Sequence, residues 1–488
     1  MGNTFAKNRL KRKGFCSRVE FTKTSTKELQ KPTMDILALL QPIEASLSKA
    51  TLRQMSRVIL AMLAMTGRVT MLGLSRWAED GGSYRTIQRF YNTTIPWAQV
   101  FWQFFSQHLL RKEEVYILAG DESVISKAGK KTYGLDHFFS GLQQQVIPSL
   151  SFFVVSLVSV SQRRSYPVCI EQTVRSEEEK AACKAKKEAK NVKSAEAKRK
   201  RGRPKGSKNK EKSEVILNPE LLRIQKMLKA LLLRMGALLH PVYLAMDGHF
   251  GNYPAFQMVQ ECGLHLISKL RWDAALCFPW DGVGHKCKYG KRVDYAHIPE
   301  KYLKSTTVKD GFQTCTYQVQ LLHQDFPVPL NVVILVKTNL TTQAWGHVIL
   351  FSSDLELSCE NLVDYYSLRF QIEFNFRDAK QFWGLEDFMN VSPTAVTNAA
   401  NLSLFMVNLA QMLMCDFRQT DPDFGVLDLK SYYRGCRYAT ELLKILPKKP
   451  DDILIAQLFR NVATLGSIHV AKTPVSSAYF WRRYCSML

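Results

Sequence analysis

The sequence predicts an α/β fold in which a helical N-terminal segment precedes a sheet that contains parallel strands. Short apolar runs at 115–120, 149–160, 242–246 and 264–270 have the length and composition of strands. Between and after them lie helical patterns, chiefly at 221–239 and 255–262. Because strands that alternate with helices are typical of parallel pairing, we expect an α/β sheet.

The N-terminal part divides into a flexible basic arm, 1–33, and a helical segment, 34–112, with helices expected at 34–47, 52–65 and 97–110. Between the last two helices, a short helix and a Gly-rich turn precede Ser83, a good N-cap for a second short helix that carries Arg85 and Arg89 on one face. This arrangement resembles a helix-turn-helix, so we predict that 34–112 is a helical DNA-binding domain that uses Arg85 and Arg89. An ordinary helical hairpin is the alternative.

The remaining boundaries follow changes in periodicity. The β alternation at 315–321 and the buried run at 331–336 break the strand–helix alternation, which predicts a mostly β insertion. Helical patterns return at 361–382 and 393–415. The predicted α/β core has a first part at 113–276 and a second part at 346–416, separated by the β insertion at 277–345. The second part includes the helix at 361–382, which contains Glu373. The C-terminal region, 417–488, is a candidate for dimerisation.

Composition favours a polyanionic partner. The 488 residues carry a formal net charge of +24, and 46% of them are hydrophobic, which is enough for a large core. No membrane span is expected, because the most apolar helix-like run, 394–414, contains several amides and is predicted to be a core helix. The eleven cysteines lie at least ten residues apart, which excludes C-x-x-C metal or redox motifs and favours reduced thiols.

A basic block at 180–212 carries half of the net charge. It holds fifteen Lys or Arg and three Glu, a net charge of +12, so it is expected to be a disordered insert. Its centre, Lys200-Arg201-Gly202-Arg203-Pro204, resembles an AT-hook, in which Arg201 and Arg203 would enter a narrow minor groove. Simple phosphate binding, to DNA or to RNA, is the alternative.

One helix, 361–382, is expected to carry a polar stripe. Its members are spaced by 3, 4, 4 and 3 residues, which places them on one side of a helix whose other positions are largely apolar. They are Tyr366, Arg369, Glu373, Arg377 and Lys380. A carboxylate among cations suits metal-assisted phosphate chemistry, whereas the alternative is a solvated salt-bridge face.

Three carboxylates are predicted to meet. Asp121 and Asp247 each follow an apolar strand, so adjacent strands would bring them to the same sheet edge, and Glu373 would join them from the helix above. Hard oxygen ligands of this kind suit Mg²⁺, with Mn²⁺ as a substitute. Two such ions, roughly 4 Å apart, are a known arrangement for phosphodiester cleavage.

The pattern Tyr366-x2-Arg369-x3-Glu373-x6-Lys380 resembles the motif of bacterial insertion-sequence transposases of the DDE class. The resemblance covers about residues 40–415 and implies an RNase H-like catalytic core. It implies metal-dependent cleavage at transposon ends and joining of the freed 3′-hydroxyl to target DNA. Asp121, Asp247 and Glu373 would be the metal ligands, and Tyr366, Arg369 and Lys380 would contact end phosphates.

The resemblance also implies double-stranded DNA as partner, at terminal inverted repeats and at the target, a homodimer in synapsis, and a cytoplasmic, nucleoid-associated location. Two features depart from it. Asp247 is followed by Gly248-His249-Phe250 rather than by the Arg-Glu pair of better-known relatives, and the basic block lies within the core. Trp345 and Trp280 are candidates for stacking a flipped base, but we expect both to be buried core residues.

Three alternatives remain. A DNA nuclease would cleave without strand transfer, a transposase-derived protein would bind DNA without cutting it, and an RNA-binding protein would use the basic block alone.

Overall fold

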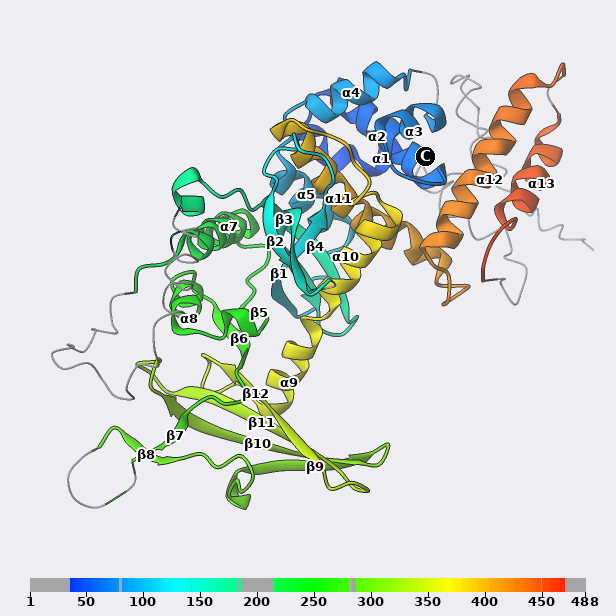
Figure 1. Cartoon of the computed structure of the whole chain (residues 1–488). Coiled ribbons are helices and arrows are strands. Elements are labelled where there is room, and N and C mark those ends of the chain that lie inside the picture. Colours follow the sequence, from blue (N-terminus) through cyan, green and yellow to red (C-terminus); the bar gives the residue numbers. More distant parts are fainter. Residues whose placement is uncertain are drawn as a thin grey trace, which may run out of the picture.

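The protein is built on one long mixed sheet that runs through the molecule, with helices packed on it and extending beyond it (Figure 1). The computed structural model describes residues 36–78, 81–141, 143–181, 185, 215–280, 282, 287–448 and 450–469. The basic arm, 1–33, and the block at 180–212, apart from Lys180, Ala181 and Ala185, lie outside these residues.

Twelve strands of the described chain form this sheet in the order β2-β3-β1-β5-β6-β12-β11-β10-β7-β8, with β4 on β3 and β9 on β10. In chain order they are β1 (Tyr116–Ser126), β2 (Asp136–Ser140), β3 (Gln145–Ser159), β4 (Arg164–Gln172), β5 (Tyr243–Met246), β6 (His265–Leu270), β7 (Leu276–Pro279), β8 (Tyr289–Arg292), β9 (Leu303–Lys309), β10 (Phe312–His323), β11 (Leu330–Asn339) and β12 (Trp345–Ser352).

The pairing confirms the predicted mixture of strand and helix and defines two halves of the sheet. In the first half, β1 pairs parallel with β5 and β5 pairs parallel with β6, while β3 and β4 are antiparallel. The second half, β7 to β12, is antiparallel and corresponds to the β-rich stretch expected from the sequence. The two halves are continuous, because β12 pairs with β6 through Ile349 opposite Leu270.

The helices form groups at the ends and on the faces of the sheet (Figure 1). They are α1 (Ile36–Leu39), α2 (Lys49–Ala64), α3 (Met71–Trp77), α4 (Tyr84–Asn92), α5 (Trp97–His108), α7 (Pro219–Met235), α8 (Tyr253–Gln260), α9 (Cys359–Leu368), α10 (Gln371–Phe382), α11 (Pro393–Phe417), α12 (Val426–Ile445) and α13 (Asp452–Ala463), with short 3₁₀ turns η1 (Gln41–Ser46), η2 (Gly248–Phe250) and η3 (Glu300–Tyr302).

The N-terminal segment is helical from α1 to α5, and its elements follow the expected caps. The Ser83 hydroxyl accepts the Thr86 backbone N–H and so begins α4. The expected helix at 34–47 is wrong in one respect, since it is divided into α1 and the 3₁₀ turn η1, which has Pro42 in its first turn.

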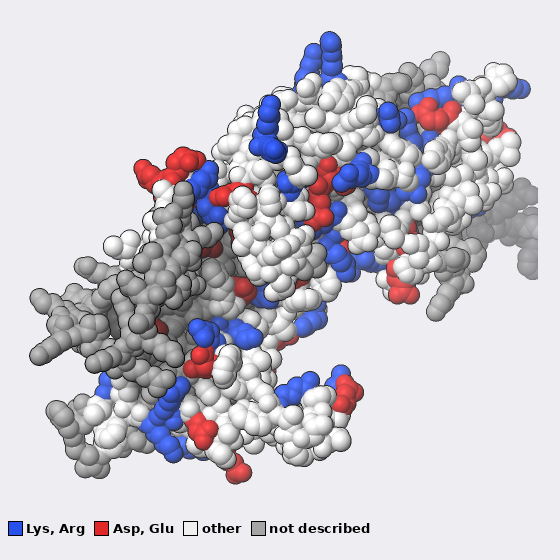
Figure 2. Space-filling model, in the orientation of Figure 1, with Lys and Arg blue, Asp and Glu red and all other residues white. Residues whose placement is uncertain are grey.

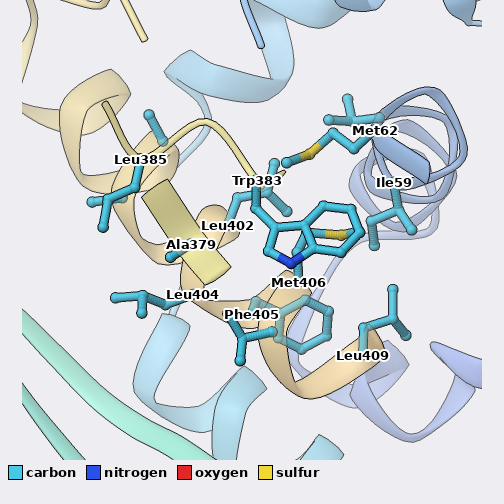
Figure 3. Packing of buried hydrophobic residues seen from close by; sticks show 14 of the residues in the cluster. Ile59, Met62, Ala379, Trp383, Leu385, Leu402, Leu404, Phe405, Met406 and Leu409 are labelled. Carbon is cyan, nitrogen blue, oxygen red and sulfur yellow. The ribbon is translucent and has the colours of Figure 1, made fainter. Parts of the chain in front are cut away.

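The two expected helices at 361–382 and 393–415 meet around a buried tryptophan. Trp383, at the end of α10, is fully buried and packs against Leu402, Phe405 and Met406 of α11 and against Ile59 of α2 (Figure 3). This contact fastens the helix that carries Glu373 to the helical N-terminal segment. Because a large aromatic side chain buries much apolar area, Trp383 fixes where α10 lies relative to α11 and α2.

The longest described helix, α11, is apolar enough to cross a membrane by length and composition alone. Within its most apolar window, 72% of the residues are buried inside the protein. Its amides are also used internally: Asn408 donates to the Pro167 carbonyl oxygen at 2.7 Å, and Gln411 donates to the Ser165 carbonyl oxygen at 3.1 Å. Such a helix packs as a core element over β4.

Candidate active site

The parallel pair β1 and β5 places the two aspartates side by side. Leu118, Ala119 and Gly120 lie opposite Leu244, Ala245 and Met246, so the next position of each strand is Asp121 and Asp247. Asp247 follows β5, and its carboxylate accepts the His249 backbone N–H at 3.1 Å.

The expectation that the first strand ends at Asp121 was wrong. β1 continues to Ser126 because β3 pairs with it along its whole length, from Tyr116 opposite Ser159 to Ser126 opposite Ser149. Asp121 therefore stands within a strand that is hydrogen-bonded on its β3 side. A carboxylate in this position has a well-fixed backbone, which favours precise placement of its oxygens.

The single helix expected to carry the polar stripe is broken into α9 and α10. At the break, the Phe370, Ile372 and Glu373 backbone N–H groups donate to carbonyl oxygens three residues earlier rather than four. Phe370 and Phe374, two of the apolar positions outside the stripe, are exposed and form an edge-to-face pair with ring centroids 5.6 Å apart. The break changes the direction of Arg369, which caps the end of α9.

Arg369 reaches Asp121 at this break. Its Nη1 donates to Asp121 Oδ2 at 2.7 Å, and the two side chains are only 14% and 16% exposed. The Arg369 guanidinium also lies 5.8 Å from the centre of the Tyr366 ring. Tyr366 and Arg369 therefore lie near the carboxylates, although the five residues of the stripe do not belong to one continuous helix.

The charges of Glu373 and Asp247 both act on Asp121. Burial is the main cause that raises the pKa of Asp121 to about 6, and repulsion by Glu373 and Asp247 contributes to this rise, while Arg369 and the Glu122 backbone N–H oppose it. Burial also raises the pKa of the Tyr366 hydroxyl, to which the negative charges of Asp247 and Asp121 contribute. Glu373 is exposed on α10 and contributes to the raised pKa of Asp121.

This donor set fits a divalent cation in its chemistry, because all three ligands are hard oxygen donors that repel one another. In the described ranges, however, no three His, Cys, Asp or Glu side chains are arranged to hold one ion. Asp121 is bound by Arg369 instead, so a cation that used Asp121 would compete with this guanidinium for Oδ2.

The other predicted contacts lie elsewhere. Lys380 donates from Nζ to the Val124 carbonyl oxygen at 3.0 Å and lies 3.4 Å from a Glu386 carboxylate oxygen, so it ties α10 to β1. Arg377 donates from Nε and Nη2 to Asp378 at 3.0 and 2.9 Å and lies over the Phe374 ring.

The predicted DNA contacts outside the stripe are not brought to the carboxylates. Arg85 and Arg89 are both exposed on α4, a helix that packs on α2, α3 and α11. Arg201 and Arg203 lie outside the described residues. Trp345 and Trp280 were expected to be buried, but both are exposed, because they lie on the antiparallel half of the sheet and at its rim.

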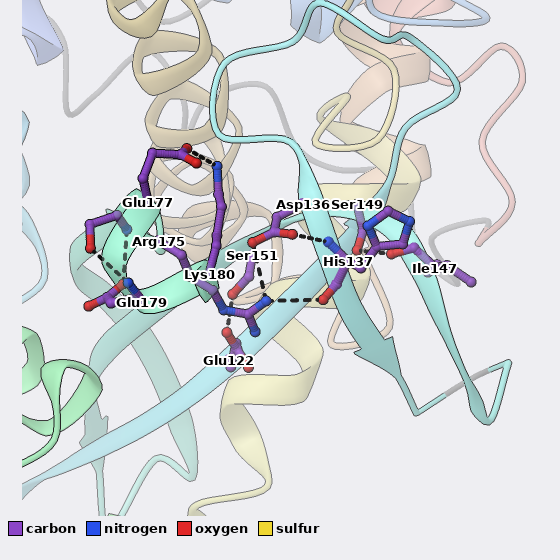
Figure 4. Close-up of polar contacts among 11 residues, drawn as sticks. Glu122, Asp136, His137, Ile147, Ser149, Ser151, Arg175, Glu177, Glu179 and Lys180 are labelled. Carbon is purple, nitrogen blue, oxygen red and sulfur yellow. Dashed lines mark hydrogen bonds and ion pairs between the residues drawn. The ribbon is translucent and has the colours of Figure 1, made fainter. Parts of the chain in front are cut away.

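Sequence reasoning missed a polar network beside Asp121. The Glu122 carboxylate accepts the Ser151 hydroxyl, and nearby Arg175 donates to Asp136 and to the His137 carbonyl oxygen, each at 3.2 Å (Figure 4). Burial raises the pKa of Glu122, partly opposed by Ser151. The only signal in the sequence is the Asp121-Glu122 pair itself, which does not show that β3 supplies the Ser151 hydroxyl to Glu122.

A second missed residue is His249, two positions after Asp247. Its Nε2 lies 3.7 Å from a Glu220 carboxylate oxygen, and this contact raises the pKa of His249. Glu220 comes from the first turn of α7, so this helix reaches the edge of the site.

A family model described as DDE superfamily endonuclease matches residues 42–323. The chain belongs to this family. In this DDE superfamily endonuclease, the matched region contains Asp121 and Asp247 and ends before Glu373. No curated protein matches the chain. The family agrees with the aspartates that β1 and β5 bring together, and it implies an endonuclease that acts on DNA with divalent metal.

Proposed function

We propose that the protein is a DNA transposase of the insertion-sequence branch that carries the Tyr-x2-Arg-x3-Glu-x6-Lys motif. It would cut at transposon ends and join the freed ends to target DNA. The observation that carries the proposal is the grouping of Asp121 and Asp247, adjacent by the β1–β5 register, with Glu373 close enough to raise the pKa of Asp121.

An RNase H-like core belongs to this proposal. The strand order β4-β3-β1-β5-β6, with the first three antiparallel and the last three parallel, supports it. So does the position of α10, which packs on β4 and β1 and brings Glu373 over the sheet. The helical segment at 34–112 would bind DNA through Arg85 and Arg89, and the block at 180–212 would add phosphate contacts.

The reaction has two steps. A water oxygen attacks the phosphorus at the transposon end, the bond to the 3′-oxygen breaks, and that oxygen takes a proton to become a 3′-hydroxyl. This hydroxyl then attacks a phosphodiester of the target, forming one phosphorus–oxygen bond as another breaks. When bound, divalent cations would activate the attacking oxygen and stabilise the leaving one.

The residues of the chain supply placement and charge. Asp121, Asp247 and Glu373 would hold Mg²⁺, or Mn²⁺ in its place. Arg369, a planar bidentate donor, would transfer from Asp121 to a phosphate oxygen when DNA binds. Tyr366 lies beside it and would contact the same strand. Synapsis of two ends implies a homodimer, to which the region at 417–488 would contribute, and its action on DNA implies a cytoplasmic, nucleoid-associated protein.

The test uses a donor DNA that carries the terminal inverted repeats flanking the coding region, incubated with protein and Mg²⁺. Integrated product supports transposition, whereas cleavage without integration would show a nuclease. Binding without cleavage by the folded wild type would show a DNA-binding protein derived from a transposase. Asp121→Asn, Asp247→Asn and Glu373→Gln should abolish cleavage while binding to end DNA persists, and comparable loss of binding would mean that these residues are not catalytic.

A further inference from the structure

A pocket of about 330 Å³ lies beside α10 and is lined by six of its residues, namely Gln371, Phe374, Asn375, Arg377, Asp378 and Phe382. Asp378 lines it and lies five residues beyond Glu373, about 140° around the helix. Its other walls come from the beginning of β4, the last turns of α11 and the beginning of α12. The charged or amide residues from these walls are Arg164, Gln411, Arg418 and Asp428.

Two guanidinium groups in this pocket lack a carboxylate partner. In the part of the chain that the structure describes, the Arg164 guanidinium has neither an ion-pair partner nor a hydrogen-bond acceptor. Arg418 donates only its Nε, to the Phe424 carbonyl oxygen at 2.8 Å. Burial lowers the pKa of Arg418 and repulsion by Arg164 lowers it further, whereas attraction by Asp378 opposes this fall, so Arg418 lies near both groups.

The carboxylates of the pocket, Asp378 and Asp428, already accept hydrogen bonds from other groups. Asp378 accepts both donors of Arg377. Asp428 is fully buried and accepts the Gly425 backbone N–H at 2.9 Å and His469 Nδ1 at 2.8 Å. The excess positive charge therefore comes from Arg164 and Arg418, which face a solvent-accessible hollow. A pair of guanidinium groups in such a position is suited to a phosphate, which both can bind through paired hydrogen bonds.

The neutral lining also suits a nucleotide unit. Gln411 donates its amide to the Ser165 carbonyl oxygen, while its Oε1 is buried without a partner and can accept a hydrogen bond. Phe374 is an apolar residue in the lining of the same pocket. A strand of DNA offers an anionic phosphate together with N–H donors and apolar faces, which matches this combination.

We propose that this pocket binds a backbone phosphate of the DNA strand that runs along α10 from the carboxylate centre. The inference rests on the proposed function, because it takes DNA as the ligand. Of the cations expected to bind end phosphates, Arg369 must first leave Asp121, and Lys380 is held by β1 and Glu386, whereas no carboxylate among the described residues forms an ion pair with Arg164 or Arg418. Figure 2 shows Lys and Arg interspersed with Asp and Glu on the face over α10 and α12.

The test compares Arg164→Gln with Arg163→Gln. The two changes remove the same charge from neighbouring residues, but Arg163 is already bound by Asp364 at 2.7 Å. Binding of a short fluorescent duplex carrying the end sequence is measured without divalent metal over a range of salt. Arg164→Gln should weaken binding about tenfold and reduce the slope of log affinity against log salt by about one, while Arg163→Gln changes little. Arg418→Gln is a second variant that should behave like Arg164→Gln, with melting temperatures checked for each.

The outcomes separate the possible ligands. Equal affinities and slopes for Arg164→Gln, Arg418→Gln and wild type would overturn the proposal. If inorganic phosphate raises the melting temperature of wild type but not of Arg164→Gln, and DNA affinity is unchanged, the pocket binds a free phosphate and the DNA assignment fails. If wild type itself does not bind the duplex, the proposed function has failed rather than the assignment of the pocket.

Discussion

Replacing Arg369 with Met should destabilise the protein by an amount that depends on pH. The Arg369–Asp121 pair has a 2.7 Å contact, and both side chains are largely buried. Removal of the guanidinium leaves Asp121 beside Glu373 and Asp247, and the site can relieve the repulsion only by protonating Asp121. From a pKa of about 6, that protonation costs about 2 kcal/mol at pH 7.5. We therefore expect a loss of about 2 kcal/mol in the free energy of unfolding at that pH.

The pH dependence follows from the direction of the shift. Because the folded-state pKa of Asp121 is raised, ionisation of this group lowers stability as pH rises from about 4 to about 6. Without Arg369 the pKa is higher still, so the loss continues above pH 6. The difference between wild type and Arg369→Met should therefore be larger at pH 7.5 than at pH 6.

The assay is urea unfolding followed by tryptophan fluorescence, with EDTA present throughout. Arg163→Met is the matched control, since the Arg163–Asp364 contact is also 2.7 Å but its side chains are 52% and 36% exposed. Exposed pairs of this kind contribute below about 1 kcal/mol. Equal losses for the two variants, or a loss for Arg369→Met that does not change between pH 6 and 7.5, would refute the reasoning.

Three further predictions concern residues away from the carboxylates. Burial lowers the pKa of Lys430 to about 7, so the folded state disfavours its ammonium form and the free energy of unfolding should rise with pH from about 7 to about 10. The melting temperature of Lys430→Met should not show this rise, and an unchanged rise in the variant would mean that Lys430 does not cause it. Asn398→Leu should lower the free energy of unfolding by about 2–4 kcal/mol in urea titrations. The change removes the hydrogen-bond partner of the Trp97 indole N–H and of two carbonyl oxygens. A loss below about 1 kcal/mol would contradict this role of the Asn398 amide. Deletion of 180–212 should weaken DNA binding and flatten its salt dependence, and an unchanged slope would show that this block does not contact phosphate.

The strands that carry the aspartates could be predicted because each is a short apolar run with one acidic residue after it. That pattern gives the strand and the parallel pairing, and the β1–β5 register then places the two residues together. It does not give the length of β1, since the polar residues after Asp121 belong to a strand only through their pairing with β3.

The helix with the polar stripe shows where periodicity is insufficient. Spacing alone places Tyr366 to Lys380 on one face, but the chain breaks at Arg369 and Phe370, and Arg369 pairs with Asp121, which lies far away in sequence. Arg164 and Arg418 could not be paired from sequence either, because β4 and α11 bring them together only in the folded chain. Local pattern predicts elements well, whereas contacts between distant segments need the fold.

The central claim is that Asp121, Asp247 and Glu373 together surround divalent cations. The most direct measurement replaces Mg²⁺ with Fe²⁺ and adds ascorbate and peroxide, so that radicals formed at the bound metal cut the polypeptide nearby. We predict cuts close to all three residues, lost together in Asp247→Asn. Cuts near only one of the three, or the same pattern in wild type and Asp247→Asn, would contradict the claim.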